Sequence, residues 1–170
     1  TVTSMITQIL YLNKMEPTAV IGGRLPLLNS NGIAGKSETM VCEACEFVDT
    51  FLQMSPDVAV LLNIDNDHLD YFKTMDNLIL SFHKFLKMSS KAYINGDDEL
   101  VKKAIEGIDA KITTFGFESS NDFYAKNITS GKFGFQFDVM KDGERLINIE
   151  LKAPGRHNVL NALAAFSVCF

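Results

Sequence analysis

Short apolar segments alternate with amphipathic helical patterns along much of the chain, and this alternation limits the possible fold more than any other feature. Residues 58–62 (VAVLL) are all apolar, as expected of a central strand in a parallel sheet. Residues 75–86 then carry apolar side chains at helical spacing, which predicts a helix covering one face of that sheet. Strands joined through helices are expected to lie parallel. The other expected elements are a helix over 2–15, a buried strand over 39–42, further strands over 18–21, 92–94 and 112–115, a helix over 100–105 capped from 95–98, and a loop over 29–37.

The pattern changes after Phe117, where helical spacing gives way to strict alternation. Apolar residues occupy every second position over 133–139 and again over 147–151, which is typical of strands with one buried face. Between them, 141–144 contains the Asp-Gly pair favoured in tight hairpin turns. We expect an antiparallel hairpin here, a third strand over 123–128, and a last helix from about Asn158. The sequence therefore predicts an α/β fold: a mainly parallel sheet flanked by helices, with an added antiparallel β-hairpin region.

Composition excludes several classes of protein. The 170 residues are 46% hydrophobic and 22% charged, which favours one globular domain over a disordered tail. A net charge of −5, with scattered Lys and Arg, argues against a nucleic-acid partner. The longest apolar run, 58–62, is too short to span a membrane. Cys42 and Cys45 have the spacing of a redox or zinc motif, but no second pair accompanies them, and we favour reduced, buried thiols of a cytoplasmic protein.

Two polar clusters follow predicted parallel strands. Residues 43–49 (EACEFVD) place Glu43 at the carboxyl end of one strand, and residues 63–70 (NIDNDHLD) follow another. Ligands of open parallel sheets bind outside the carboxyl ends of the strands. Carboxylates and the His68 imidazole suit a divalent cation, and magnesium accepts them where a phosphate supplies further ligands. The alternative is a solvated loop that caps a helix, in which His68 has no functional role.

A third polar cluster precedes the last predicted helix, at residues 154–161 (PGRHNVLN). Arg156, His157, Asn158 and Asn161 can hydrogen-bond an adenine edge or a phosphate, and the free amides of a helix start favour anions. The alternative is an ordinary helix start, with Asn158 as its cap and Arg156 on the surface.

Taken in order, these motifs resemble the central domain of the Mur ligases, cytoplasmic enzymes that add amino acids to the peptidoglycan precursor. The resemblance is carried by EACEFVDTFL at 43–52, NIDNDHLDYF at 63–72 and PGRHNVLNALAA at 154–165. Ile21-Gly22-Gly23, followed by Asn31 and by Gly35-Lys36-Ser37, also matches the alanine-adding branch. The likeness covers nearly the whole chain, 1–170, and implies a P-loop NTPase-like sheet with antiparallel strands beside it.

The resemblance also implies functional roles. Glu43 holds the place of the family's glutamate that coordinates magnesium near the ATP γ-phosphate, and His68 the place of the histidine at a second magnesium. His157, Asn158 and Asn161, with Arg156 beside them, hold the places that cradle adenine. The implied cofactors are ATP and Mg²⁺. The implied reaction activates the carboxylate of UDP-N-acetylmuramate as an acyl phosphate, which the amine of L-alanine then attacks.

Two departures from the family pattern affect these expectations. The phosphate loop of the family should immediately precede Thr1, so we expect the chain to be a fragment, inactive by itself, whose substrates bind through flanking domains. Gly35-Lys36-Ser37 does not replace that loop, because it precedes a strand instead of a helix. Lys84, the lysine nearest the place where some relatives carry a carbamylated lysine, is assigned no role.

Two other functions stay open. A recycling ligase that attaches a preformed tripeptide to the same sugar shares these central motifs, and the absent carboxyl-terminal domain would distinguish it. A non-catalytic α/β binding module is the third possibility, and it predicts no effect of magnesium. It also predicts scattered polar clusters, whereas the ligase interpretation predicts that all three clusters meet at one rim of the sheet.

Overall fold

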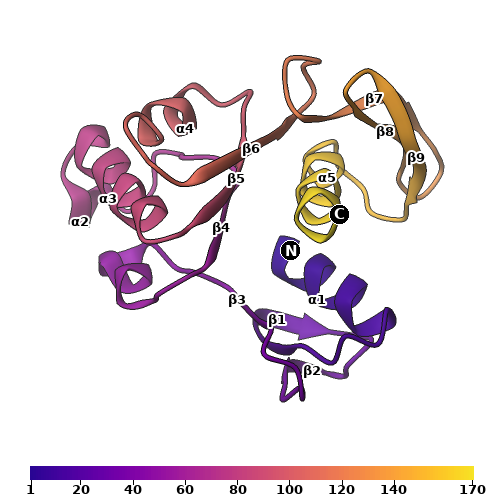
Figure 1. Cartoon of the computed structure of the whole chain (residues 1–170), viewed down its shortest axis with the longest axis horizontal. Helices are drawn as coiled ribbons and strands as arrows, with labels where there is room; N and C mark the ends of the chain where they lie inside the picture. Colours follow the sequence, from indigo (N-terminus) through magenta and orange to yellow (C-terminus); the bar gives the residue numbers. More distant parts are fainter. The chain divides into compact units, whose positions relative to one another are not determined.

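The computed structural model describes residues 1–170, which divide into two compact units (Figure 1). Unit 1 comprises Thr1–Ala44 with Ala165–Phe170, and unit 2 comprises Cys45–Ala164. Each unit has its own sheet, in the order β2-β1-β3 in unit 1 and β4-β5-β6-β7-β8-β9 in unit 2. The helices are too short, or too polar, for any of them to cross a lipid bilayer. The predicted α/β class is confirmed, with four parallel strand pairs and an antiparallel region at β7–β9.

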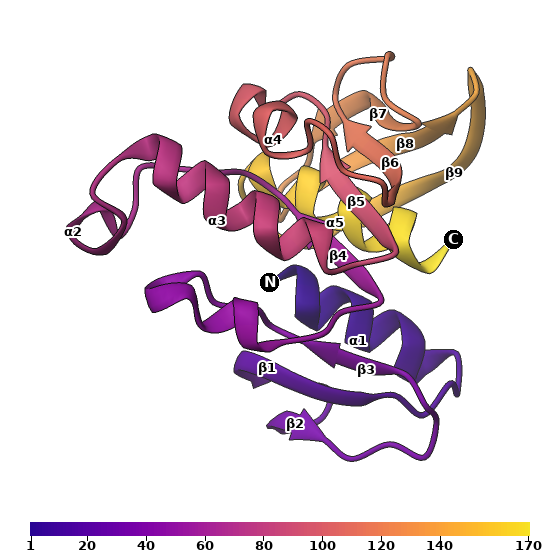
Figure 2. The same ribbon diagram turned by 60° about the vertical axis from the view of Figure 1, so that its left-hand side comes forward.

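Unit 1 is a small sheet with one helix packed on it. Helix α1 (Val2–Leu12) contacts β1 (Thr18–Leu25) and β3 (Met40–Cys42), and Figure 2 shows it lying along the sheet. Strand β1 pairs parallel with β3 and antiparallel with β2 (Ser30–Ile33). Alternate residues of β1, Ala19 and Ile21, point inward and form a buried cluster with Leu25. The period of two buries one face of the strand.

Two predictions for unit 1 are wrong. The expected loop over 29–37 contains strand β2, and β1 continues through Gly22 and Gly23 to Leu25. A tight turn joins these strands, in which Leu28 N donates to Leu25 O and Asn29 takes a positive φ of 51°. The glycine-rich composition, which predicted loops, instead accommodates a register irregularity between the paired strands.

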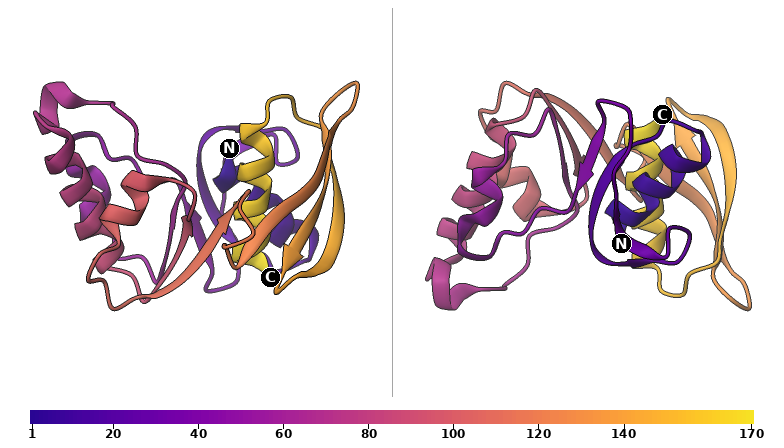
Figure 3. Two further views of the ribbon diagram at one scale, coloured as in Figure 1. Left: turned by 90° about the horizontal axis from the view of Figure 1, so that it is seen from above. Right: turned by 90° about the horizontal axis from the view of Figure 1, so that it is seen from below.

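The parallel part of unit 2 consists of β4 (Val58–Leu61), β5 (Lys91–Asn95), β6 (Lys111–Gly116) and the start of β7 (Phe123–Ser130). Helices α3 (Met75–Lys87) and α4 (Glu99–Ala104) lie on one side of β4–β6 (Figures 1 and 3). The Asp98 carboxylate accepts from the N–H groups of Leu100 and Val101, so the predicted helix cap is confirmed. Apolar side chains dominate the core between helices and strands, where Leu78, Leu86, Ala92, Ile94 and Val101 are at most 1% exposed.

The antiparallel part of unit 2 is the predicted three-stranded region. Strand β8 (Phe135–Lys141) pairs with β7 and with β9 (Glu144–Leu151). Asp142 and Gly143 join β8 to β9 with φ values of 51° and 82°, the two positive values that a type I′ hairpin turn requires. The first turns of α5 (His157–Cys169), which belong to unit 2 as far as Ala164, lie beside these strands (Figures 1 and 3).

The burial of two predicted strands differs from expectation. Residues 39–42 were expected to be buried, yet Met40 is 60% exposed, and β3 stands last in the order of its sheet. Residues 58–62 were expected to form a central strand, yet β4 stands first in its sheet and Val58 is 41% exposed. An unbroken apolar run does not distinguish a strand buried on both faces from one buried on alternate residues, as β4 is.

Asp138 in β8 is a buried carboxylate held by the neighbouring strands. Its oxygens accept hydrogen bonds from Asn148 Nδ2 at 2.7 Å and Asn127 Nδ2 at 2.8 Å, and Arg145 lies 3.7 Å away. These contacts, that of Asn148 foremost, hold the pKa of Asp138 below its ordinary value. Because the folded pKa is lowered, the ionised form stabilises the fold above the unfolded pKa of about 3.9, and this stabilisation is lost as the pH falls through the folded value.

We therefore expect Asp138→Asn to lower the free energy of unfolding at pH 7, and the difference from the unaltered chain to shrink between pH 5 and pH 2. Urea unfolding followed by circular dichroism at several pH values measures both effects. Asp109→Asn, at an exposed position, is the control and should change neither. A difference that stays constant with pH would contradict the role of the ionised carboxylate.

Candidate functional site

Glu43 directly follows β3 in unit 1, as predicted, and its side chain is fixed by β1. Its Oε2 accepts a hydrogen bond from Gly22 N at 2.6 Å, and its own N–H donates to Val20 O at 3.1 Å. A Cβ at position 22 would lie 2.9 Å from Oε2, so this contact requires glycine. The carboxylate is exposed, and its remaining lone pairs are free to bind a cation or a donor.

His68 lies in unit 2, at the start of the short helix α2 (Leu69–Phe72), with a left-handed φ of 55°. Its Nε2 lies 3.8 Å from Glu46 Oε1 and its Nδ1 lies 3.6 Å from Asp67 Oδ1. The ring of Phe47 packs against the imidazole with centroids 4.9 Å apart. Glu46, Asp67 and His68 each offer one ligand atom, and these three atoms all lie within 4.8 Å of one another.

This group has the donor set of a divalent-cation site. Around Mg²⁺, with bonds of about 2.1 Å, neighbouring ligand atoms stand about 3 Å apart, so the side chains need only a small inward movement. One imidazole nitrogen can serve a given ion. Nε2 and the Glu46 carboxylate are therefore the candidate ligand pair, while Asp67 Oδ1 lies 3.6 Å from Nδ1 and accepts a hydrogen bond from the His68 backbone N–H.

The sequence analysis missed Glu46. It identified the cluster 43–49 but singled out Glu43 alone, whereas the structure places Glu46 beside the imidazole of His68. The second glutamate of the E-A-C-E run was the available signal. What could not be read from sequence is that the chain passes from unit 1 to unit 2 between these two glutamates, at Ala44–Cys45.

The residues at the start of α5 are held by local contacts. Gly155 has a φ of 88°, and a Cβ there would stand 2.4 Å from His157 Cε1, so the turn requires glycine. The Arg156 guanidinium lies 4.5 Å from the centre of the Phe117 ring, a cation–π contact. Arg156 is exposed, yet its direction is fixed.

The two asparagines of this segment are linked to each other. Asn158 Nδ2 donates to Pro154 O at 2.6 Å, and Asn161 Nδ2 donates to Asn158 Oδ1 at 3.1 Å. Asn158 is the second residue of α5 and does not accept from a helix N–H in these contacts, so its interpretation as the cap is wrong. Asn161 keeps its Oδ1 and one N–H available, the acceptor and donor pair that matches an adenine edge.

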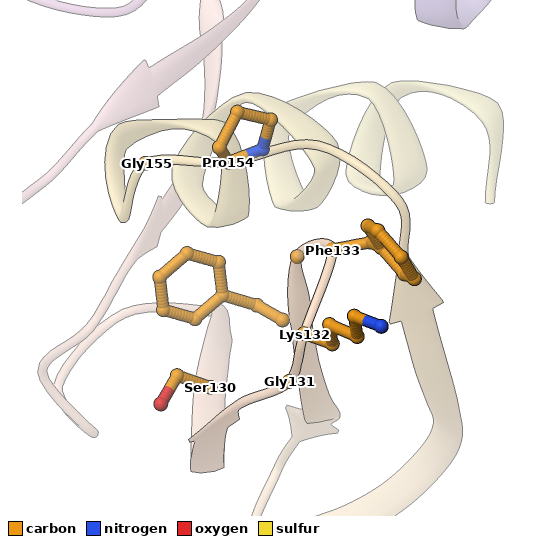
Figure 4. A pocket seen from close by; sticks show the side chains of 8 residues that line it. Ser130, Gly131, Lys132, Phe133, Pro154 and Gly155 are labelled. Atoms are coloured by element: carbon orange, nitrogen blue, oxygen red, sulfur yellow. The ribbon is translucent and has the colours of Figure 1, made fainter.

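A hollow of about 460 Å³ adjoins this segment (Figure 4). Pro154 and Gly155 form one side of it, and the turn between β7 and β8, with the strand ends Ser130 and Phe135, forms the other. Phe133 is 72% exposed, and Lys132 Nζ lies 5.2 Å from the centre of its ring. An exposed aromatic ring with a cation beside it offers a surface for a planar group.

The predicted site residues are divided between the two units. Glu43 belongs to unit 1, while His68, Arg156, His157, Asn158 and Asn161 belong to unit 2. Within unit 2, His68 follows the first strand in the order of the sheet and α5 follows the last. The expectation that all three clusters meet at one rim stays a prediction.

Other sequence expectations have clear outcomes. The thiols are free, but Cys45 is exposed and Cys42 and Cys169 are partly exposed, so the expectation of buried cysteines is wrong. Burial raises the pKa of Cys169 to about 11.

Lys36 N and Ser37 N both donate to Glu16 O, and the segment leads into β3, as expected for a turn that is no phosphate loop. Lys84 is exposed in the last turn of α3.

Comparison with known proteins gives a consistent result. The family described as "Mur ligase middle domain" matches residues 1–169. The chain is 42% identical to the UDP-N-acetylmuramate–L-alanine ligase of Clostridium acetobutylicum over 171 residues, which cover 98% of this chain and 37% of that protein. The chain thus spans somewhat over a third of the length of the curated relatives it matches.

Solved structures resemble the chain to a similar extent. The UDP-N-acetylmuramate–alanine ligase MurC of Thermotoga maritima superposes with a TM-score of 0.85 at 26% identity, over 99% of this chain and 38% of that one. The UDP-N-acetylmuramate:L-alanyl-γ-D-glutamyl-meso-diaminopimelate ligase of Neisseria meningitides gives a TM-score of 0.87 at 24% identity, over 99% of this chain and 56% of that one. The second likeness concerns the fold alone.

The contact between Glu43 and Gly22 generates a prediction. In Gly22→Ala the new methyl group displaces the exposed carboxylate, so the amide of residue 22 loses its partner and should exchange hydrogen about tenfold faster, as expected for one lost hydrogen bond. The free energy of unfolding should change by less than about 1 kcal/mol, because the tip of Glu43 can move. Amide exchange measured by NMR tests this.

Gly23→Ala is the matched control, because a Cβ at that position meets no atom within 4 Å. Equal exchange at residue 22 in the two variants would show that Glu43 is not held there.

Proposed function

We propose that this chain, which belongs to the Mur ligase family as its middle domain, is the ATP-handling module of a carboxylate–amine ligase of peptidoglycan synthesis. The specific reaction proposed joins UDP-N-acetylmuramate to L-alanine in the cytoplasm. The γ-phosphoryl group of ATP passes to the muramate carboxylate, giving an acyl phosphate and ADP. The amine of L-alanine then attacks the acyl carbon, and inorganic phosphate leaves. Both substrates would bind through parts of the protein outside this chain.

The observation that carries this proposal is the group formed by His68, Glu46 and Asp67. A ligase of this class must bring a nucleotide with three phosphates up to an anionic carboxylate, and the repulsion between them has to be neutralised. An imidazole nitrogen 3.8 Å from one carboxylate, with a second carboxylate at its other nitrogen, fits a divalent cation. A bound Mg²⁺ would withdraw charge from the γ-phosphoryl group and hold it in line with the acceptor.

The chain's own residues would orient that site. Asp67 Oδ1 accepts a hydrogen bond from the His68 backbone N–H at 2.8 Å and lies 3.6 Å from Nδ1, so it helps to hold this segment while Nε2 is on the side of Glu46. Phe47 covers the imidazole and limits its rotation. We assign Glu43 to the cation near the γ-phosphate and His68 to a second cation, since the Glu43 carboxylate is exposed and its direction is fixed by Gly22.

We assign adenine binding to the start of α5. Asn161 offers an acceptor and a donor in one plane, and its remaining N–H is oriented by Asn158. His157 and Arg156 flank the same turn, and the hollow at Pro154, Gly155 and Phe133 gives a surface for a flat ring. Adenine has an amino group beside a ring nitrogen, and this donor and acceptor match the acceptor and donor of Asn161.

The runner-up is the recycling ligase, which would use the same cation and nucleotide sites with a preformed tripeptide as the amine. An assay of the full-length protein with UDP-N-acetylmuramate, Mg-ATP and either amine distinguishes the two by which product forms. A non-catalytic module would release no phosphate with either amine and would respond to no magnesium concentration.

The cation assignment predicts the effect of removing its ligands. In the full-length ligase, Glu43→Ala and His68→Ala should each lower kcat/KM by about 100-fold or more, because charge neutralisation by a metal contributes several kcal/mol to the transition state. Phosphate release measures this. His83→Gln is the control, since His83 bonds Ala104 O on another part of the unit. Normal turnover in both alanine variants would remove the metal-site assignment.

The adenine assignment predicts a change in nucleotide preference. Losing a bidentate contact to the base costs about 1–3 kcal/mol, so Asn161→Ala should raise the KM for ATP roughly tenfold and lower the ratio of kcat/KM for ATP to that for ITP, which lacks the amino group. Asn66→Ala, at an exposed position, is the control. An unchanged ATP to ITP ratio would place adenine recognition elsewhere.

A further inference from the structure

Glu46 and His68 lie on two separate segments of unit 2, and the Asp49 side chain joins these segments by a hydrogen bond. Asp49 lies three residues after Glu46 and accepts a hydrogen bond on Oδ2 from the hydroxyl of Tyr71, at 2.9 Å. Tyr71 in turn lies three residues after His68, in the helix that His68 begins. The other oxygen of Asp49 accepts from the hydroxyl of Ser81, which is 4% exposed on α3.

The backbone beside this carboxylate is strained. Val48 and Asp49 have φ and ψ of 53°, 33° and 57°, 23°, in the left-handed region, and His68 is left-handed as well. A β-branched residue such as Val48 rarely adopts this conformation, so the surrounding contacts have to impose it. Those contacts include the Thr50 hydroxyl, which donates to Cys45 O at 2.7 Å, and Phe51, which stacks on Phe85 with ring centres 4.7 Å apart.

We propose that Asp49 is a positioning residue that holds Glu46 and His68 at the separation a divalent cation needs. This inference rests on the proposed function, which makes those two side chains metal ligands. An ionised carboxylate only accepts, so it directs both hydroxyl protons toward itself and fixes the two segments against α3. The contact also raises the pKa of the Tyr71 phenol above its ordinary value, which favours the protonated form that donates to Asp49.

Asp49 acts through geometry and not as a ligand. Each of its oxygens already receives a hydroxyl, and it does not belong to the set of ligand atoms within 4.8 Å of one another. The substitution Asp49→Asn separates the two roles. Asparagine tolerates the left-handed backbone and can bond both hydroxyls, which accept as well as donate, but it carries no charge.

The chain offers a direct test, because it contains only three histidines. Mn²⁺, which takes the same oxygen and imidazole ligands as Mg²⁺, broadens the NMR signals of a nearby imidazole. In the unaltered 170-residue chain, titration with Mn²⁺ alone should broaden His68 before His83, which serves as the internal reference. Asp49→Ala and Tyr71→Phe should each raise the Mn²⁺ concentration at half-broadening about tenfold or more, as loss of a partner that orients metal ligands does.

Asp49→Asn should return the midpoint to within about threefold of the unaltered chain, and Asp76→Ala, at an exposed site on α3, should not change it. The positioning role is overturned if Asp49→Ala and Tyr71→Phe leave the midpoint unchanged, or if Asp49→Asn is as weak as Asp49→Ala. Tyr71→Phe keeps the ring and removes only the hydroxyl, so it remains informative should Asp49→Ala unfold.

A separate readout distinguishes failure of the proposed function from failure of this inference. No broadening of His68 in the unaltered chain would contradict the metal assignment itself. Positioning by Asp49 is then judged from the amides of Tyr71 and Phe72, which donate to His68 O at 2.9 and 3.0 Å. Their hydrogen exchange should be faster in Asp49→Ala and Tyr71→Phe and unchanged in Asp76→Ala. Unchanged exchange in all three variants would overturn the inference.

Discussion

The parallel pairing of β4, β5 and β6 is the constraint on which the rest of unit 2 depends. Ala59 pairs with Ala92, and Ala92 pairs with Ile112, so one register runs through three strands. This register buries alternate residues under α3 and α4, and it ends all three strands at one edge of the sheet. The segment that carries His68 begins at that edge, directly after β4. The position of the candidate cation site therefore follows from hydrophobic packing of the strands below it.

The sequence predicted those elements whose pattern is local. The amphipathic stripe of α3, the Asp98 cap and the Asp142-Gly143 turn are each specified by a few neighbouring residues, and each is present. The predictions that were wrong concern how strands pair with one another. Strand β2 exists because Ala19 and Val20 offer it a partner, and its own residues, which include Asn31 and Gly32, resemble a turn. The position of a strand in its sheet depends on the strands that pair with it, which its own sequence does not show. For this reason β4 was wrongly expected at the centre.

The residues of the candidate site likewise fall into those that a local pattern identified and those that depend on contacts distant in sequence. Glu43 and His68 could be identified because they follow strands, and Asn158 and Asn161 because they begin a helix. Glu46 could not be distinguished from the other carboxylates of its cluster, because its role depends on a contact with His68, 22 residues further along. Asp49 and Tyr71 are equally distant from each other in sequence, and their hydrogen bond depends on left-handed residues that no local pattern predicts.

Acidic residues of this chain can be sorted by how fully their oxygens are used. Asp97 accepts from Phe117 N and from Asn121 Nδ2, and it fills the space that a side chain at Gly116 would need. Asp98 and Asp138 also accept two or more hydrogen bonds each, and such carboxylates have little capacity left for a ligand. Glu46 is different, since its carboxylate lies 3.8 Å from the His68 imidazole, beyond hydrogen-bond distance. A carboxylate and an imidazole held near each other but not bonded keep their lone pairs available, and a cation between them would satisfy both. The unused capacity of Glu46, more than its charge, is the reason that we propose it as a ligand.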